Sequence, residues 1–194
     1  MADTGAPWNI PFVEPTDLVR DYPAADEAQA LAVAAGLSAA GGLVAVKSVV
    51  KTDVFSASVA AGASVAVSGL SIEHAVAQVG NKVVLFGVTS STNDIQVGAH
   101  ALAADGVLLN IGDAAGARVR VASGTYSGTD NRGVHAPSHA VFEPANTSTV
   151  TYDVRVFNIR TATRTIFVNR SVGDNDNGDV TRTSSTLILC EVKV

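Results

Sequence analysis

The residues most able to do chemistry in this chain are two histidines in a polar, glycine-rich stretch. His135 and His139 form the pattern H-A-P-S-H. Imidazoles can hold a metal ion when a third ligand and supporting hydrogen bonds are present. Pro137 between them breaks any helical face that would bring them together. We therefore interpret them as loop histidines that could lie near an interface, and we expect no metal site.

A second polar stretch, DNDNGD at residues 174–179, resembles a calcium loop in composition. The EF-hand pattern needs oxygen ligands at positions 1, 3 and 5, glycine at position 6 and glutamate at position 12. Counted from Asp174, glycine falls at position 5 and Ser185 at position 12, so the pattern fails. Our interpretation is a polar turn, because turns require Asn, Asp and Gly. A Ca²⁺ site made of Asp174, Asp176 and Asp179 is the alternative.

The sequence lacks the motifs of nucleophilic, phosphate-binding and metal-dependent catalysis. It contains no G-x-S-x-G, G-x-x-x-x-G-K-[ST], H-E-x-x-H or C-x-x-C pattern. The glycines of GDAAGARV (112–119) are not followed by Lys-Ser, as a phosphate loop requires. A sugar-processing module would need aromatic platforms, and the chain has one Trp and three Tyr. We expect that the protein is not an enzyme and uses no cofactor.

The charge balance limits the partners. A formal net charge of −5 argues against nucleic acid, which is bound by a basic surface. Charged residues make up 16% of the chain, against roughly 25% in an ordinary globular domain. Either the surface is small and neutral, or another chain covers much of it, and we favour the second interpretation because covered interfaces are depleted in charge.

The remaining compositional features concern compartment and stability. Cys190 is the one cysteine, so no internal disulfide forms, and within STLILCEVKV it is expected to be a small buried hydrophobe. The N-terminus has no basic region followed by an apolar core, and no apolar run approaches 18 residues. We expect a protein that folds in a cytoplasm, without a signal peptide, a transmembrane helix or a membrane partner.

The stretch WNIPFVEPTDLVRDYP, residues 8–23, has an unusual combination of apolar side chains and prolines. It is too apolar for a solvated tail, and its prolines exclude a helix or a central strand. Prolines pre-set the backbone and so lower the cost of ordering an extended segment on a partner. We predict a docking arm whose contacts come from Trp8, Ile10, Pro11, Phe12, Val13, Pro15, Leu18 and Tyr22.

A short helix is predicted next, over PAADEAQALAVAAGLSAA (23–40). Pro23 suits the first helical position, Asp26 and Glu27 favour the first turn, and glycines at 41–42 end the helix. The helix is rich in alanine and would bury little area alone, so it needs a surface to lie on. Residues 1–42 thus form one predicted unit, an anchoring arm with a short helix.

From residue 43 the apolar period changes from helical to two. Turn residues recur about every 8 to 12 positions, which indicates an all-β, antiparallel sandwich over 43–194. The predicted strands are LVAVKSVV, DVFSASV, SVAVSG, KVVLFGVTSS, DIQVGAHAL, GVLLNIG, ARVRVAS, HAVFEP, VTYDVRVFNI, RTIFVNR and STLILCEVKV.

Two kinds of strand are present. GARVRVAS (116–123) alternates valine with arginine, so it is expected to have one wet face. KVVLFGV (82–88) and TLILCEV (186–192) are apolar on both faces. One face of each fits the core, and a second copy of the same chain is the simplest cover for the other.

Two details carry local expectations. In TYDVRVFNIR (151–160) the apolar phase changes, which predicts a bulge near Val156 or Phe157. SIEHAVAQVG (71–80) fits either a short helix or a crossing loop.

Two long polar loops, 123–140 and 171–185, are the predicted contact surfaces. Their candidate contact residues are Tyr126, Asn131, Arg132, His135, His139, Asp174, Asp176 and Asp179.

The N-terminal stretch IPFVEPTDLVRDYPAADEAQALAVAAGL resembles a segment of tailed-bacteriophage structural proteins, typically V-x-P-x-D-L-V-x-D-Y-P followed by an alanine-rich helix. The C-terminal half, through TYDVRVFN, IFVNRS, GDNDNGD and SSTLILCEVKV, resembles the single jelly-roll domains of such virions. Residues 43–110 carry no recognisable signature. The resemblance implies a homotrimer that attaches by its N-terminus and presents a jelly-roll-like β-sandwich outward.

The expected function is therefore that of a virion component assembled in the bacterial cytoplasm. The main hypothesis is a capsid decoration, cement or head-fibre trimer that docks on the major capsid protein. The alternative is a tail or collar protein that binds a host-surface glycan or receptor through its loops. Receptor-binding tips carry exposed aromatic residues, and Tyr126 is the one aromatic residue in the two loops, so we favour decoration.

Overall fold

The computed structural model describes residues 2–3, 11–12, 42–95, 97–126, 135–174 and 182–194. The chain forms two compact units, Met1–Leu43 with Lys193–Val194, and Val44–Val192. In the first unit, β1 (Ala2–Asp3) pairs with β2 (Pro11–Phe12) in antiparallel register. The predicted arm residues Pro11 and Phe12 therefore form β2. The predicted helix over 23–40 lies outside the described residues, as do Trp8, Ile10, Val13, Pro15, Leu18 and Tyr22.

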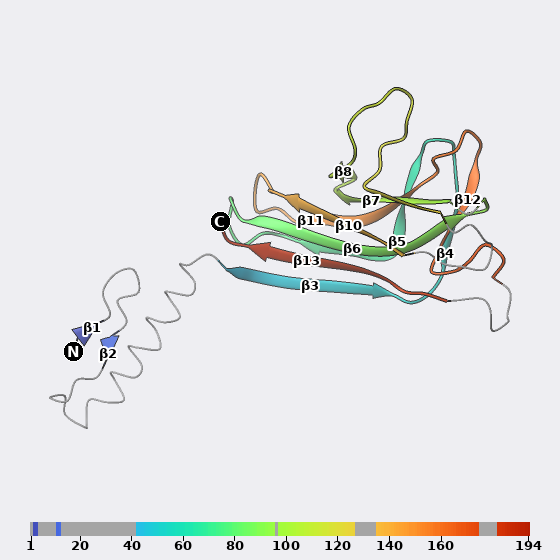
Figure 1. Ribbon diagram of the computed structural model, residues 1–194. Coiled ribbons are helices and arrows are strands. Elements are labelled where there is room, and N and C mark those ends of the chain that lie inside the picture. Colours follow the sequence, from blue (N-terminus) through green and yellow to red (C-terminus); the bar gives the residue numbers. More distant parts are fainter. Residues whose placement is uncertain (1, 4–10, 13–41, 96, 127–134, 175–181) are drawn as a thin grey trace. The chain divides into compact units, whose positions relative to one another are not determined.

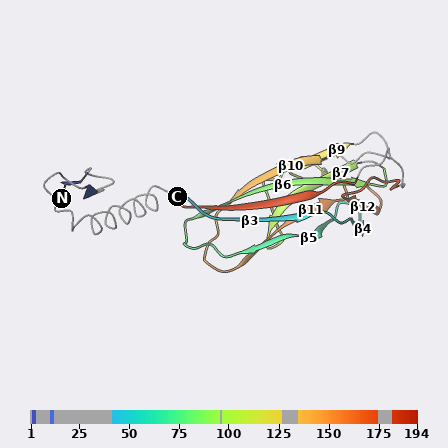
Figure 2. The same ribbon diagram turned by 90° about the horizontal axis from the view of Figure 1, so that it is seen from below.

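The second unit is an antiparallel β-sandwich of two sheets, as the sequence predicted (Figure 1 and, turned by 90°, Figure 2). The first sheet has the order β3 (Leu43–Lys51), β13 (Ser185–Val192), β6 (Lys82–Asn93), β12 (Arg164–Val168) and β4 (Phe55–Val59), and β10 (His135–Phe142) also pairs with β6. The second sheet has the order β5 (Ser64–His74), β11 (Val150–Phe157), β7 (Val97–Ala104) and β8 (Val107–Leu109), and β9 (Ser123–Tyr126) also pairs with β7.

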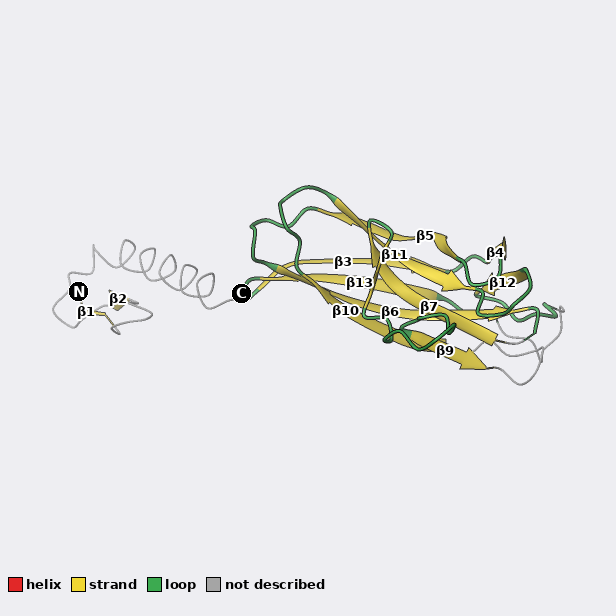
Figure 3. Ribbon diagram, turned by 90° about the horizontal axis from the view of Figure 1, so that it is seen from above, coloured by secondary structure: helices red, strands yellow, loops and turns green. Residues whose placement is uncertain are grey.

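Strand β6 organises the first sheet because its two halves have different partners. Its Lys82–Val88 portion pairs with β13, and Val83–Ser90 pairs with β10. Its last residues, Ser91–Asn93, pair with β12. The strands β3, β13, β6 and β10 consequently lie side by side (Figure 3).

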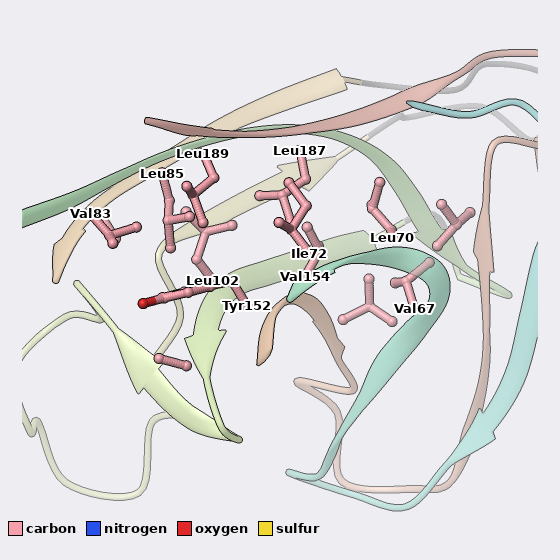
Figure 4. Packing of buried hydrophobic residues seen from close by; sticks show 14 of the residues in the cluster. Val67, Leu70, Ile72, Val83, Leu85, Leu102, Tyr152, Val154, Leu187 and Leu189 are labelled. Atoms are coloured by element: carbon pink, nitrogen blue, oxygen red, sulfur yellow. The ribbon is translucent and has the colours of Figure 1, made fainter. Parts of the chain in front are cut away.

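The main hydrophobic core lies between the two sheets. Strands β5, β6, β7, β11 and β13 all contribute to it (Figure 4). The ring of Phe142 meets that of Tyr152 edge-on, with centroids 6.0 Å apart. The buried side chains that Figure 4 labels are Val67, Leu70, Ile72, Val83, Leu85, Leu102, Tyr152, Val154, Leu187 and Leu189.

The outer face of the second sheet is covered by the protein's own chain. Ala99, Ala101 and Phe157 are buried there beneath Leu108, Ile111, Val119, Val121 and Ala122. The predicted strand over 116–123 is wrong, because residues 110–122 form the covering loop that rises beside β8 in Figure 1. Its valines alternate with arginines because one side of the loop lies on an apolar face.

The bulge predicted near Val156 or Phe157 is wrong, because both residues pair in regular register with β5, and an irregularity lies in β5 instead. The pairing of β11 with β5 shifts between Asp153, opposite Ser71, and Arg155, opposite Ala66. The extra residues therefore belong to β5. They surround Gly69, whose φ of +76° is a conformation that glycine adopts without strain.

The structure decides two further expectations, for residues 71–80 and for residues 123–140. The ambiguous stretch 71–80 is not a helix, because Ser71–His74 completes β5 and the remainder is a loop. The predicted loop 123–140 is wrong at both ends, which form β9 and the first part of β10. Pro137 is tolerated in β10 because that strand lies at an edge, where a missing N–H breaks no ladder.

Gly98 of β7 lies at the closest approach of three strands, and replacing it with alanine is expected to be severely destabilising. A Cβ atom there would overlap the Ser91 carbonyl oxygen and the Thr125 hydroxyl. We expect the free energy of unfolding to fall by about 3 kcal/mol for Gly98→Ala, since the overlap involves backbone that cannot move aside. Urea denaturation measures the change.

Gly112→Ala is the matched control for Gly98→Ala. The nearest atom to a Cβ at Gly112 is the Val121 carbonyl oxygen at 4.0 Å, which is an ordinary contact. Equal unfolding midpoints for the two variants would show that the approach at Gly98 is not tight.

Candidate interaction surface

The candidate site begins with the alternation of side chains in β6 and β13. Val83 and Leu85 of β6, and Leu187 and Leu189 of β13, point into the core and are fully buried. Successive side chains of a strand point to opposite faces. The residues between and beside these four must therefore lie on the outside of the first sheet.

Strand register arranges these outward residues in rows that also include β10. Phe86 lies opposite Ile188 on one side and His139 on the other. None of the residues in the three rows is Asp, Glu, Lys or Arg. Across β13, β6 and β10 the rows are Cys190–Val84–Val141, Ile188–Phe86–His139 and Thr186–Val88–Pro137.

Strand β3 extends this surface beyond β13. Val49 packs against the core, and Lys47 Nζ donates a hydrogen bond to the Glu73 carbonyl of β5, so the odd-numbered residues of β3 face the second sheet. The even-numbered Val44, Val46 and Val50 therefore face outward, and all three are exposed. We call the three rows together with these three valines the outer apolar face.

The outer apolar face is exposed to solvent in the part of the chain that the structure describes. Phe86 at its centre is 50% exposed, and Val141 on β10 is 54% exposed. Scattered exposed apolar residues are normal on a protein surface, but a contiguous set on four neighbouring strands is typical of an interaction site. The two sheets thus differ, because the second sheet has a covering loop on its outer side and the outer apolar face does not.

The predicted contact histidines lie on this face. His139 sits beside Phe86, and His135 lies four residues earlier on the same side of β10. Residues four apart in a strand are separated by about 13 Å, so the two rings do not share a metal ion. No cluster of three or more His, Cys, Asp or Glu able to hold a metal occurs in the part of the chain that the structure describes.

Asp174 has two cationic partners. Its carboxylate lies 2.9 Å from Arg182 and 3.4 Å from Arg170. Arg170 also stacks on the Phe167 ring, with its guanidinium carbon 4.5 Å from the centroid. Asp174 therefore forms salt bridges with both arginines. Asn131, Arg132, Asp176 and Asp179 lie outside the described residues.

Tyr126 ends β9 and is 71% exposed. It borders residues 127–134, which are outside the described part. Strand β9 lies next to β10, and His135 is the first residue of β10 that pairs with β6. Tyr126 therefore lies at the same end of the sandwich as His135.

The interior contains a polar layer that the sequence analysis missed. Beyond Leu85, the inward-facing positions of β6 are Gly87, Thr89 and Ser91, and β7 contributes the fully buried His100. Within the described residues, neither ring nitrogen of His100 has a hydrogen-bond partner of good geometry. Burial lowers the pKa of His100 to about 4, against a smaller raising effect of the Ala136 carbonyl. The ring is therefore neutral at neutral pH.

A second buried polar group ties β13 to the loop after β5. Glu191 Oε2 lies 2.8 Å from His74 Nε2, and Glu191 Oε1 accepts hydrogen bonds from the Ala77 N–H and the Asn81 amide. Burial alone would raise the pKa of Glu191. The bonds from Asn81, Ala77 and His74, with the charge of His74, instead hold it below its ordinary value. No sequence pattern indicated this network, because Glu191 is more than 100 residues away from His74 and Asn81.

The described unit is thus a two-sheet antiparallel β-sandwich with one covered and one open outer face. No helix in the described residues is long and apolar enough to cross a membrane. No protein-family model matches the chain, and no curated protein matches it significantly. Among solved structures, the EclA C-terminal domain, described as a sugar-binding protein, aligns with 61% of this chain and 74% of its own at 9% identity. Its TM-score is 0.34, too low to carry an inference about this chain.

Proposed function

We propose that this chain is a structural accessory protein of a tailed-phage virion, a trimeric capsid decoration, cement or head-fibre protein. Its N-terminal arm docks on the major capsid protein, and its β-domain faces outward. The outer apolar face carries this proposal. A surface of that kind needs a permanent cover, as in obligate assemblies, whose interfaces are more hydrophobic than those of transient complexes.

The strand order supports the finer assignment of the sandwich as a jelly roll. A jelly roll arises when a long antiparallel ribbon rolls up, so that the first strand pairs with the last, the second with the last but one, and so on inward. Here β3 pairs with β13, β5 with β11, β6 with β10, and β7 with β8 and β9. Strands β4 and β12, which pair with each other, are additions to that ribbon.

The N-terminal resemblance supports the virion location. Residues 13–23 match the spacing of the phage segment in V-x-P-x-D-L-V-x-D-Y-P. The low charge of the whole chain fits a protein much of whose surface is covered. We propose no catalytic activity, cofactor or nucleic-acid partner for it.

A tail or collar location is the second candidate, and Tyr126 favours it. An aromatic residue that is 71% exposed is typical of a surface that binds a glycan or a receptor. In this alternative the same arm anchors the protein at the neck or tail.

Immunogold electron microscopy of purified phage particles, with antibody against residues 43–194, tests the proposal. Gold over the head supports the accessory capsid role. Gold at the neck or tail supports the second candidate, and intact particles without gold would refute both. Deletion of residues 1–22 is expected to abolish particle binding, and unchanged binding would contradict the role of the arm.

A further inference from the structure

We infer that the outer apolar face is the surface through which three copies of this chain pack together, with Phe86 at its centre. This inference rests on the proposed trimer and names its interface. The face consists of the rows Cys190–Val84–Val141, Ile188–Phe86–His139 and Thr186–Val88–Pro137, with Val44, Val46 and Val50 beside them.

The covering segment of the second sheet distinguishes the two outer faces of the sandwich. The covering loop, residues 110–122, lies on the outer side of the second sheet and, together with Leu108 of β8, packs over Ala99, Ala101 and Phe157. On the outer apolar face, by contrast, Phe86, Val88 and Val141 stay exposed in the described part of the chain. Within the described residues, the outer face of the second sheet is therefore covered and the outer apolar face is not.

The chemistry of the face favours a second copy over a charged partner. Its three rows hold no acidic residue, lysine or arginine, and His139 and Cys190 are their titratable groups. Such a face offers nothing that would select nucleic acid, a charged peptide or an anionic membrane surface. Its complement is another neutral apolar surface, and the same face of the other copies, brought together around a threefold axis, meets that description.

The size of the face also agrees with an interface between copies. Four strands about 4.8 Å apart, each about 24 Å long, give a flat area of about 450 Å² before side-chain relief is counted. Stable complexes bury at least about 600 Å² on each partner. The accessible surface of the side chains exceeds this flat area, so the face approaches that size. Aromatic residues near the centre of an interface are enriched among those that contribute most to its affinity.

Replacing Phe86 with glutamate tests the interface directly. Light scattering with size-exclusion chromatography should give the mass of a trimer for the full-length wild-type chain and of a monomer for Phe86→Glu. Val141→Glu, at an exposed position in a neighbouring row, should have the same effect. Val107→Glu is the matched control, because Val107 is 66% exposed on β8 of the other sheet, and it should remain trimeric.

The reactivity of Cys190, the single cysteine of the chain, gives a second measurement, and no cysteine has to be introduced for it. Cys190 is a half-buried free thiol on the outer apolar face. We expect maleimide labelling of the wild type to be at least about tenfold slower than labelling of Phe86→Glu, because thiol reactivity requires access. Circular dichroism of both proteins checks that the variant is folded.

The outcomes separate the interface from the proposed function. A wild-type monomer, or trimeric Phe86→Glu and Val141→Glu with unchanged Cys190 labelling, would overturn the interface. A wild-type monomer that is nevertheless found on phage particles would overturn the interface and the trimeric state, and would leave the proposed virion location intact. A trimer that is absent from particles would refute the proposed function and leave the interface intact.

Discussion

Glu191→Ala is expected to lower the free energy of unfolding by about 3 kcal/mol, because it removes the acceptor of a buried polar network. Glu191 is buried and accepts from the Ala77 N–H at 2.8 Å and the Asn81 amide at 2.5 Å, with His74 at 2.8 Å. The substitution would leave those three donors without their acceptor. Urea denaturation at pH 7 measures the loss.

The conservative variant Glu191→Gln separates charge from shape. Its side-chain oxygen can still accept one of these hydrogen bonds, so we expect a smaller loss than for alanine. The pKa of Glu191 is held below the ordinary value of 4.5, so its stabilising contribution is complete above that value. The contribution disappears as the pH falls through the folded-state pKa. Equal stability of wild type, Glu191→Gln and Glu191→Ala would show that the network contributes nothing.

The second large expected effect is a loss of stability in mild acid caused by His100. Its pKa in the folded protein is about 4, against an ordinary value of 6.5. Between these values the unfolded chain takes up a proton that the folded protein does not, so stability falls as the pH drops from about 6.5 to 4. The whole difference corresponds to about 3 kcal/mol, at 1.36 kcal/mol for each pKa unit.

Unfolding free energies measured at several pH values between 4 and 7 test this effect. In His100→Gln the part of the slope due to His100 should vanish, whatever the variant's stability at pH 7. A control variant, His135→Gln, replaces an exposed histidine and should keep the wild-type slope. Identical slopes in His100→Gln and wild type would mean that His100 is not the group responsible.

Most strands could be predicted because β-period and burial coincide. In β6 and β13, alternate residues such as Leu85 and Leu189 fill the core, and the double-sided apolar character marked these strands correctly. The same reasoning failed at 116–123, where valine alternates with arginine in a loop. Alternation of apolar and polar residues shows that one side of a segment is apolar and the other is solvated. It does not show that the backbone pairs with a neighbouring strand.

Turn residues misled the prediction in the opposite direction. Glycine, serine and proline between residues 123 and 140 indicated a loop, yet both ends form strands on β7 and β6. Local composition could not show this, because partners such as Thr125 and Gly98 are distant in sequence.

The candidate surface was predictable only in part. The runs KVVLFGV and TLILCEV indicated a second apolar face, and the structure places them next to each other. That His139 and Val141 of β10 join the same surface depends on register, which no local pattern contains. The burial of His100 and Glu191 likewise depends on which strands lie opposite them across the sandwich.

The position of β13 has a consequence for synthesis. This strand, at residues 185–192, lies between β3 and β6, so β3, which is made early, has no strand of its sheet to pair with until β13 leaves the ribosome. Folding that requires such distant partners is slow and cannot be completed on a partial chain. Prematurely terminated chains would lack the middle of the first sheet, and with it part of the surface on which we propose that copies pack. On that proposal, assembly is restricted to molecules that have been translated through β13.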